Sequence, residues 1–109
     1  ETGDAKITKG YRLPAKFVIH TVGPVWDGGA YDESKLLASC YRRSLQLANE
    51  YKLQSIAFPS ISTGVYGYPK NLAAEIAVNT VREQDMTSVA EVIFCCFSAE
   101  DLRIYRALL

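Results

Sequence analysis

The spacing of apolar residues changes several times along the chain, and each change marks a predicted element of secondary structure. Three short runs rich in β-branched and aromatic residues predict strands over residues 16–22, 54–58 and 91–97. Between and after these runs, apolar residues recur every three or four positions, which predicts helices over residues 32–51, 69–81 and 98–108. Pro69 favours the first turn of the second helix, and Ser98 with Asp101 favours a capping box at the start of the third.

The order of these elements, β-α-β-α-β-α, predicts an α/β fold in a single domain over residues 1–109. Because each predicted strand returns to the next through a helix, the sheet should be mostly parallel, with right-handed crossovers and helices packed on its faces. Three strands make a narrow sheet with at least one unpaired edge, whereas open parallel sheets of this size commonly have about five. We therefore expect further strands to be missing from this sequence or to come from another chain.

Composition and charge are those of an ordinary globular protein. Of the 109 residues, 49% are hydrophobic and 22% are charged, and 12 basic residues balance 12 acidic ones. The lack of a basic excess or stripe argues against binding to nucleic acid through the phosphate backbone, and no apolar run is long enough to span a bilayer. The three cysteines, Cys40, Cys95 and Cys96, make no even disulfide framework, which predicts reduced, buried thiols in an intracellular, cytoplasmic protein.

The loops that follow the predicted strands are the expected place for a ligand, because open parallel sheets bind ligands beyond the carboxyl ends of their strands. These loops cover residues 23–29, residues 59–68 and the neighbourhood of Ser98. In the middle loop, Gly64 and Gly67 allow backbone N–H groups to approach an anion closely and permit positive φ angles. The helix that follows adds the positive end of its dipole. A plain strand-to-helix turn that needs two glycines for its geometry explains the loop equally well.

The middle loop and its flanks together resemble a known family. Residues 61–69, which contain Ser62-Thr63-Gly64-Val65-Tyr66-Gly67, resemble the second ADP-ribose loop of macrodomains. Residues 2–24 resemble the stretch that enters the central strand in the MacroD-like branch, and residues 57–61 match the strand that leads to the loop. The resemblance implies the three-layer α/β/α macrodomain fold, here as a partial, mostly parallel sheet that lacks the N-terminal strands. It also implies an ADP-ribose site formed by Ile61, Ser62, Thr63, Gly64, Val65, Tyr66, Gly67 and Phe97.

What the resemblance implies about activity depends on residues outside this sequence. In the MacroD-like branch the reaction is hydrolysis of ADP-ribose from mono-ADP-ribosylated proteins, or deacetylation of O-acetyl-ADP-ribose, without a metal or other cofactor. The family's first ligand loop and its catalytic residues have no counterpart among the 109 residues. We therefore expect the C-terminal portion of a macrodomain with no catalytic residue of its own. Two alternatives stay open: a module that binds ADP-ribose without turnover, and a fragment that associates through its unpaired sheet edge.

The remaining chemically active side chains have simpler explanations. His20 lies in the middle of a predicted strand, where a packed, hydrogen-bonded core histidine is more common than a catalytic base. One histidine and scattered thiols offer no ligand spacing for a metal ion. Ser62 lacks the surroundings of an activated nucleophile. Asp27 and Asp32 are expected to be solvated, and Trp26 is expected to pack at the surface of the first ligand-side loop.

Overall fold

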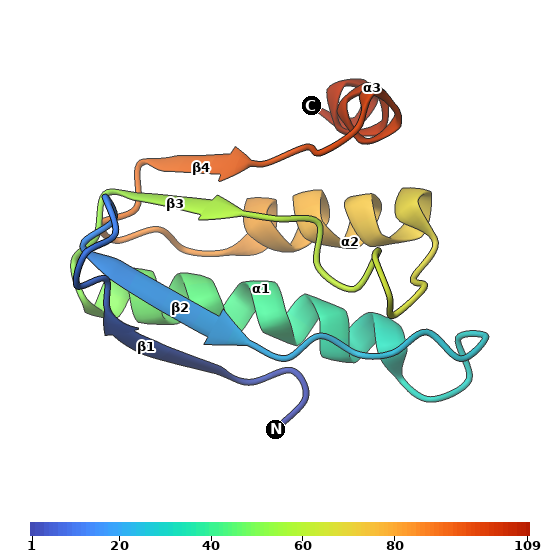
Figure 1. Cartoon of the computed structure of the whole chain (residues 1–109), viewed down its shortest axis with the longest axis horizontal. Helices are drawn as coiled ribbons and strands as arrows, with labels where there is room; N and C mark the ends of the chain where they lie inside the picture. Colours follow the sequence, from blue (N-terminus) through green and yellow to red (C-terminus); the bar gives the residue numbers. More distant parts are fainter.

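The computed structural model describes all 109 residues and contains four strands and three helices (Figure 1). Their bounds, in chain order, are β1 Ala5–Lys9, β2 Phe17–Thr21, α1 Glu33–Glu50, β3 Ser55–Phe58, α2 Lys70–Glu83, β4 Glu91–Phe94 and α3 Ala99–Leu108. The α/β class and all three helices are confirmed, with helix ends within about two residues of the predicted ones. The third predicted strand is shorter than expected, because Cys95, Cys96 and Phe97 lie beyond the end of β4.

The strands form two separate two-stranded sheets. Strand β1, which the sequence pattern did not predict, pairs with β2 in antiparallel register, with Ala5 opposite Thr21 and Lys9 opposite Phe17. Strands β3 and β4 pair in parallel, with Ser55 opposite Glu91. The expected mostly parallel pairing therefore holds for β3 and β4 only. No ladder joins β2 to β3, although both run toward the same end of the molecule in Figure 1.

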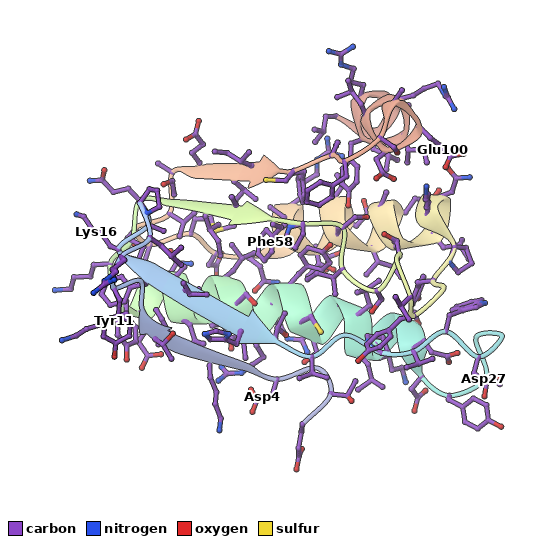
Figure 2. The ribbon with its side chains drawn as sticks, in the orientation of Figure 1. Asp4, Tyr11, Lys16, Asp27, Phe58 and Glu100 are labelled. Carbon is purple, nitrogen blue, oxygen red and sulfur yellow. The ribbon has the colours of Figure 1, made fainter.

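The helices and strands share one hydrophobic core. Helix α1 packs along α2, and α2 packs against α3. The side chains of Leu37, Tyr41 and Leu45 on α1 are almost fully buried and belong to the same core cluster as Phe58 of β3. The ring centroids of Tyr41 and Phe58 lie 4.9 Å apart. Figure 2 shows Phe58 pointing into this interior, while the labelled charged side chains lie at the periphery. The core thus fixes β3, and the loop that follows it, against α1.

The start of the last helix confirms Ser98 as its N-cap, but the return bond of a capping box, from the Ser98 N–H to the Asp101 side chain, is not formed. The hydroxyl of Ser98 accepts a hydrogen bond from the backbone N–H of Asp101 at 3.1 Å, as expected of an N-cap residue. Pro69 directly precedes α2, and its carbonyl accepts from the N–H of Ala73. No helix combines the length and apolar character needed to cross a membrane.

The core position predicted for His20 was wrong, although the predicted hydrogen bond is present. Its ring is exposed and lies 2.9 Å from the hydroxyl of Thr8 on β1, so it is a surface group of the hairpin instead of a core residue. The partner of the hydrogen bond depends on the unpredicted β1, because Thr8 becomes the neighbour of His20 only when β1 pairs with β2.

Candidate functional site

Three loops lie toward the end of the molecule to which β2, β3 and β4 all point (Figure 1). They join β2 to α1, β3 to α2 and β4 to α3. This arrangement brings together the loops that the sequence selected as ligand-binding candidates, as expected for the carboxyl ends of strands in an open α/β fold.

The loop between β3 and α2 is held in a defined turn by its own hydrogen bonds. The N–H of Gly67 donates to the carbonyl of Gly64 at 3.0 Å, and the N–H of Tyr68 donates to the carbonyl of Ser62 at 2.9 Å. The hydroxyl of Thr63 donates to the carbonyl of Ser60 at 3.1 Å. The left-handed backbone positions are Ser62, with φ of 67°, and Gly67, with φ of 71°. The φ angle of Gly64 is not positive, although glycine would permit it.

This turn leaves a row of main-chain donors free. None of the backbone N–H groups of residues 62–66 donates a hydrogen bond to another part of the protein. The first N–H groups of α2 follow directly. They have no hydrogen-bond partner within the helix, because no helical carbonyl lies one turn before them. Val65 and Tyr66 are exposed, so solvent or a ligand can reach this segment. A run of free N–H groups that leads into a helix N-terminus is a favourable environment for a phosphate group.

The loop after β2 is fastened to this donor-lined turn. The N–H of Trp26 donates to the carbonyl of Tyr66 at 2.9 Å, and the rings of Trp26 and Tyr68 lie 4.7 Å apart. At Gly23 the two loops approach so closely that a Cβ atom would collide with the hydroxyl oxygen of Ser62. Trp26 therefore does more than cover the surface, because it joins two of the three ligand-side loops.

A buried carboxylate organises the loop that carries Trp26. Glu33, in the first turn of α1, is 1% exposed. Its carboxylate oxygens accept hydrogen bonds from the backbone N–H groups of Asp27 at 2.8 Å, Gly29 at 3.0 Å and Tyr31 at 2.6 Å. Desolvation raises the pKa of this carboxyl, but the backbone hydrogen bonds outweigh it and the net pKa is lowered. Glu33 is thus an ionised group that holds residues 27–31 in a tight turn.

The importance of Glu33 can be tested through Trp26, the only tryptophan of the chain. Replacing Glu33 with Gln removes the charge that strengthens three hydrogen bonds, so we expect the loop to loosen and the emission of Trp26 to shift to the red. The matched control is Glu50→Gln, at the exposed end of the same helix. An unchanged spectrum for Glu33→Gln would contradict this role.

The same bonds predict a pH dependence. Because the folded pKa of Glu33 lies below its ordinary value of 4.5, the carboxylate stabilises the fold fully above that value. This contribution is lost as the pH falls through the lower, folded pKa. We therefore expect the emission of Trp26 to be constant from neutral pH to about pH 5 and to shift below pH 4.5 in the native chain, but not in Glu33→Gln.

The other candidate residues are distributed as follows. Ile61, Ser62 and Thr63 are half-buried, whereas residues 64–67 are exposed. Phe97 is 82% exposed on the separate loop between β4 and α3. Asp27 and Asp32 are exposed, as predicted. No group of three or more His, Cys, Asp or Glu side chains is arranged to hold a metal ion. Glu33 was not identified from the sequence, although a carboxylate directly after a glycine-rich loop and at a helix start was a usable signal.

These features define a class of protein. The chain is an α/β protein in which main-chain donors between a strand and a helix are disposed to hold phosphate. Residues 1–77 match the family model of the Macro domain. The chain belongs to the macro domain family.

Similar proteins support this assignment. A macro domain-containing protein of Chlorobaculum tepidum is 64% identical over 99% of this chain and 64% of its own length. An O-acetyl-ADP-ribose deacetylase of Citrobacter rodentium is 54% identical over 98% of this chain and 62% of its own length. The structure of a Trypanosoma brucei macrodomain in complex with ADP-ribose superposes with a TM-score of 0.89 at 40% identity, covering 99% of this chain and 46% of that one. The chain thus spans just under two thirds of the length of these curated relatives.

Proposed function

We propose that this chain supplies the diphosphate-binding part of an ADP-ribose site. The observation that carries the proposal is the run of free N–H groups at residues 62–66, placed directly before the N-terminus of α2. Main-chain donors of this kind each contribute about 1.5–3 kcal/mol to a charged acceptor where water is excluded. The complex of the Trypanosoma brucei relative with ADP-ribose supports the choice of ligand.

The exposed aromatic side chains give the rest of the ligand a place in this proposal. Tyr66 is the last residue of the donor-lined turn and is 41% exposed, so its ring is available to cover the ribose next to the diphosphate. Phe97 is available to pack near the adenine and its ribose. Trp26 has a supporting role, because its N–H already bonds the carbonyl of Tyr66 and thereby fixes the turn.

For the full-length protein we propose hydrolysis of ADP-ribose from mono-ADP-ribosylated proteins or deacetylation of O-acetyl-ADP-ribose, as in the MacroD-like branch. The name of the Citrobacter rodentium relative supports this choice over a non-catalytic module that reads ADP-ribose. Within this chain, Glu33 is a buried carboxylate that supports the loop bonded to Tyr66, and its oxygens already accept three N–H groups. It is therefore committed to structure, and we assign no general base to this chain.

Calorimetric titrations with ADP-ribose, ADP and AMP test the ligand assignment. We expect ADP-ribose and ADP to bind and AMP to bind at least about tenfold more weakly, because AMP lacks one of the two phosphates. Equal binding of AMP and ADP would contradict the assignment of residues 62–66 to the diphosphate. Release of ADP-ribose from a modified protein by this chain alone would contradict the absence of a catalytic group.

A further inference from the structure

The balance of positive and negative charge over the whole chain hides a local excess of positive charge at one end of the molecule. Residues 5–26 contain four basic residues and no acidic one. Three of the four, Lys9, Arg12 and Lys16, lie in or beside the turn that joins β1 to β2. Figure 2 shows this turn, marked by Lys16, at the opposite end of the molecule from Asp27, which belongs to one of the ligand-side loops.

Backbone contacts hold this turn in a closed loop. The N–H of Gly10 donates to the carbonyl of Lys16 at 2.8 Å, and the N–H of Leu13 donates to the carbonyl of Gly10 at 2.9 Å. The loop is so tight that a Cβ atom at Gly10 would collide with the carbonyl oxygen of Ala15. Tyr11 lies in the left-handed region, with φ of 50°. The residues between Gly10 and β2 are all exposed, so their side chains project from a fixed backbone.

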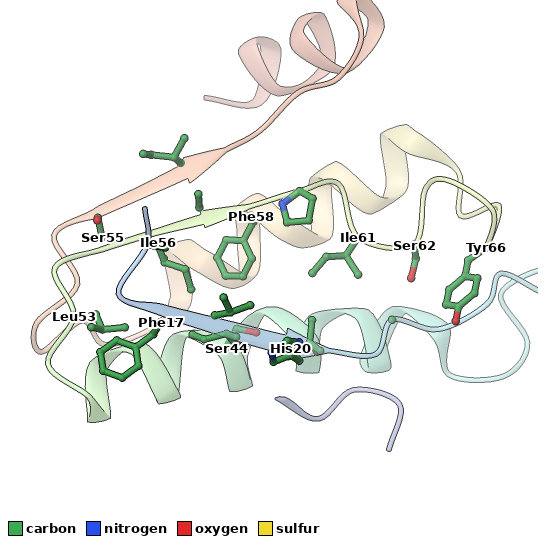
Figure 3. A pocket seen from close by; sticks show the side chains of 18 residues that line it. Phe17, His20, Ser44, Leu53, Ser55, Ile56, Phe58, Ile61, Ser62 and Tyr66 are labelled. Carbon is green, nitrogen blue, oxygen red and sulfur yellow. The ribbon is translucent and has the colours of Figure 1, made fainter. Parts of the chain in front are cut away.

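A fourth cation joins these three from a different part of the chain. Lys52 follows α1, and its neighbour Tyr51 packs against Phe17 of β2, with ring centroids 5.5 Å apart. Figure 3 shows Phe17 beside Leu53 as well, so the segment after α1 lies next to the start of β2. Lys16 and Lys52 line the same hollow, and no acidic residue lines it. The fold therefore gathers four cations at this end.

None of these four cations is neutralised within the protein. The ion pairs of the structure are Arg43 with Asp4 and Lys70 with Glu100. The four cations are all exposed and take part in neither pair. Glu50, at the end of α1, is close to one of them in sequence but forms no ion pair. The positive charge is therefore available to a partner.

Large apolar side chains are exposed among the cations. The side chain of Tyr11 is 87% exposed and that of Leu13 is 59% exposed. Single-stranded nucleic acid is held by this combination, because cations follow its phosphates and its unpaired bases stack on aromatic rings. A lipid surface fits less well, because two side chains on a short turn offer little apolar area to bury in a bilayer.

We propose that this end of the molecule binds single-stranded nucleic acid, with phosphates on Lys9, Arg12, Lys16 and Lys52 and a base stacked on Tyr11. These five residues form the basic tip. The proposal runs against the expectation from total charge, which ignores where the charges lie. It goes beyond the proposed function, because the basic tip lies at the opposite end from the ligand-side loops and requires no ADP-ribose.

Fluorescence anisotropy with a labelled oligouridylate of about eight nucleotides tests the proposal. Uracil is chosen because it offers no adenine to the proposed ADP-ribose site. With about four phosphate contacts, the logarithm of the binding constant should fall with the logarithm of the salt concentration with a slope of about −3. ADP-ribose in excess should not displace the oligouridylate. No binding at low salt, or displacement by ADP-ribose, would overturn the proposal.

Two variants of Tyr11 separate stacking from charge. Tyr11→Ala should weaken oligouridylate binding about tenfold, whereas Tyr11→Phe keeps the ring and should bind as the native chain does. Neither substitution alters the net charge, and the exposed side chain contributes little to the core. Equal affinity of the two variants would overturn the assignment to nucleic acid, because an acidic protein or a lipid headgroup needs no stacking ring.

A matched pair of charge variants tests the position of the site. Arg12→Gln should weaken binding and reduce the size of the salt slope by about 0.7, the value for one phosphate of a single strand. Lys35→Gln removes the same charge from an exposed position in the first turn of α1, at the ligand end, and should change neither quantity. Equal effects of the two substitutions would overturn the proposal, because attraction would then depend on net charge alone.

Vesicles of phosphatidylcholine and phosphatidylserine in equal parts are the second probe. We expect the chain to bind oligouridylate in preference to these vesicles at the same salt concentration. Retention on the vesicles without binding to oligouridylate would overturn the proposal and assign the basic tip to a lipid surface.

Discussion

Replacing Gly64 with Glu is expected to weaken ADP-ribose binding by about 100-fold or more while leaving the fold intact. The new carboxylate would repel the diphosphate and displace it from at least two main-chain donors, a loss of about 3 kcal/mol. The fold should tolerate the change because a Cβ atom at Gly64 meets no other heavy atom within 4 Å, and its φ is not in the left-handed region. Calorimetry measures the affinity, and circular dichroism melting measures the stability.

The control for Gly64→Glu places the same charge at the other end of the strands. Leu13, in the turn between β1 and β2, is 59% exposed, and Leu13→Glu should bind ADP-ribose as the native chain does. If Gly64→Glu retains native affinity, the diphosphate does not lie against residues 62–66. If both variants lose affinity equally, the effect is one of net charge and not of position.

Replacing Asn49 with Ala is expected to lower the free energy of unfolding by about 2–4 kcal/mol and the Tm by about 10–20 °C. The side-chain oxygen of Asn49, near the end of α1, accepts the N–H groups of Thr87 at 3.1 Å, Ser88 at 3.0 Å and Val89 at 3.0 Å. Its amide nitrogen donates to the carbonyl of Leu45 at 3.0 Å. One side chain thus holds the segment that leads into β4, and no other group replaces its bonds.

Asn79→Ala on α2 is the matched control for Asn49→Ala. Asn79 is exposed and makes no side-chain hydrogen bond. Its replacement with Ala therefore gives the same gain in helix propensity as Asn49→Ala but removes no hydrogen bond. We expect its free energy of unfolding to stay within about 0.5 kcal/mol of the native value or to rise slightly. Equal stability of the two variants in denaturant unfolding would show that Asn49 does not hold the segment before β4.

The helices could be predicted because they depend mainly on local pattern and caps, whereas β1 could not. Of its five residues, Lys6 and Lys9 are charged, and only Ala5 is buried, so the alternation that marks a strand is too short to stand out. Strand β1 is fixed by its partner β2, and without it Thr8 could not be predicted as the hydrogen-bond partner of His20. The separation of the two sheets is likewise a property of spatial arrangement that no single segment encodes.

For the candidate site, the sequence pointed to the loop of residues 61–67 but not to the groups that support it. The glycines of residues 61–67 drew attention to the turn, yet the left-handed position at its start belongs to Ser62, a residue for which propensity favours other conformations. Glu33 looked like one of many charged residues at a helix start. Its role depends on three N–H groups that converge only after the loop folds back on α1.

The free donors of residues 62–66 belong to the main chain, and this has a consequence for how the sequence of this proposed diphosphate loop can vary. Val65 projects fully into solvent, so exchanging its side chain leaves every donor in place. Proline, which lacks the N–H altogether, is the substitution that removes a donor outright. A saturation library scored for ligand retention should therefore be permissive at Val65 to uncharged side chains but exclude proline. An alignment scored on side-chain chemistry alone would underrate a recognition element that is encoded by backbone shape.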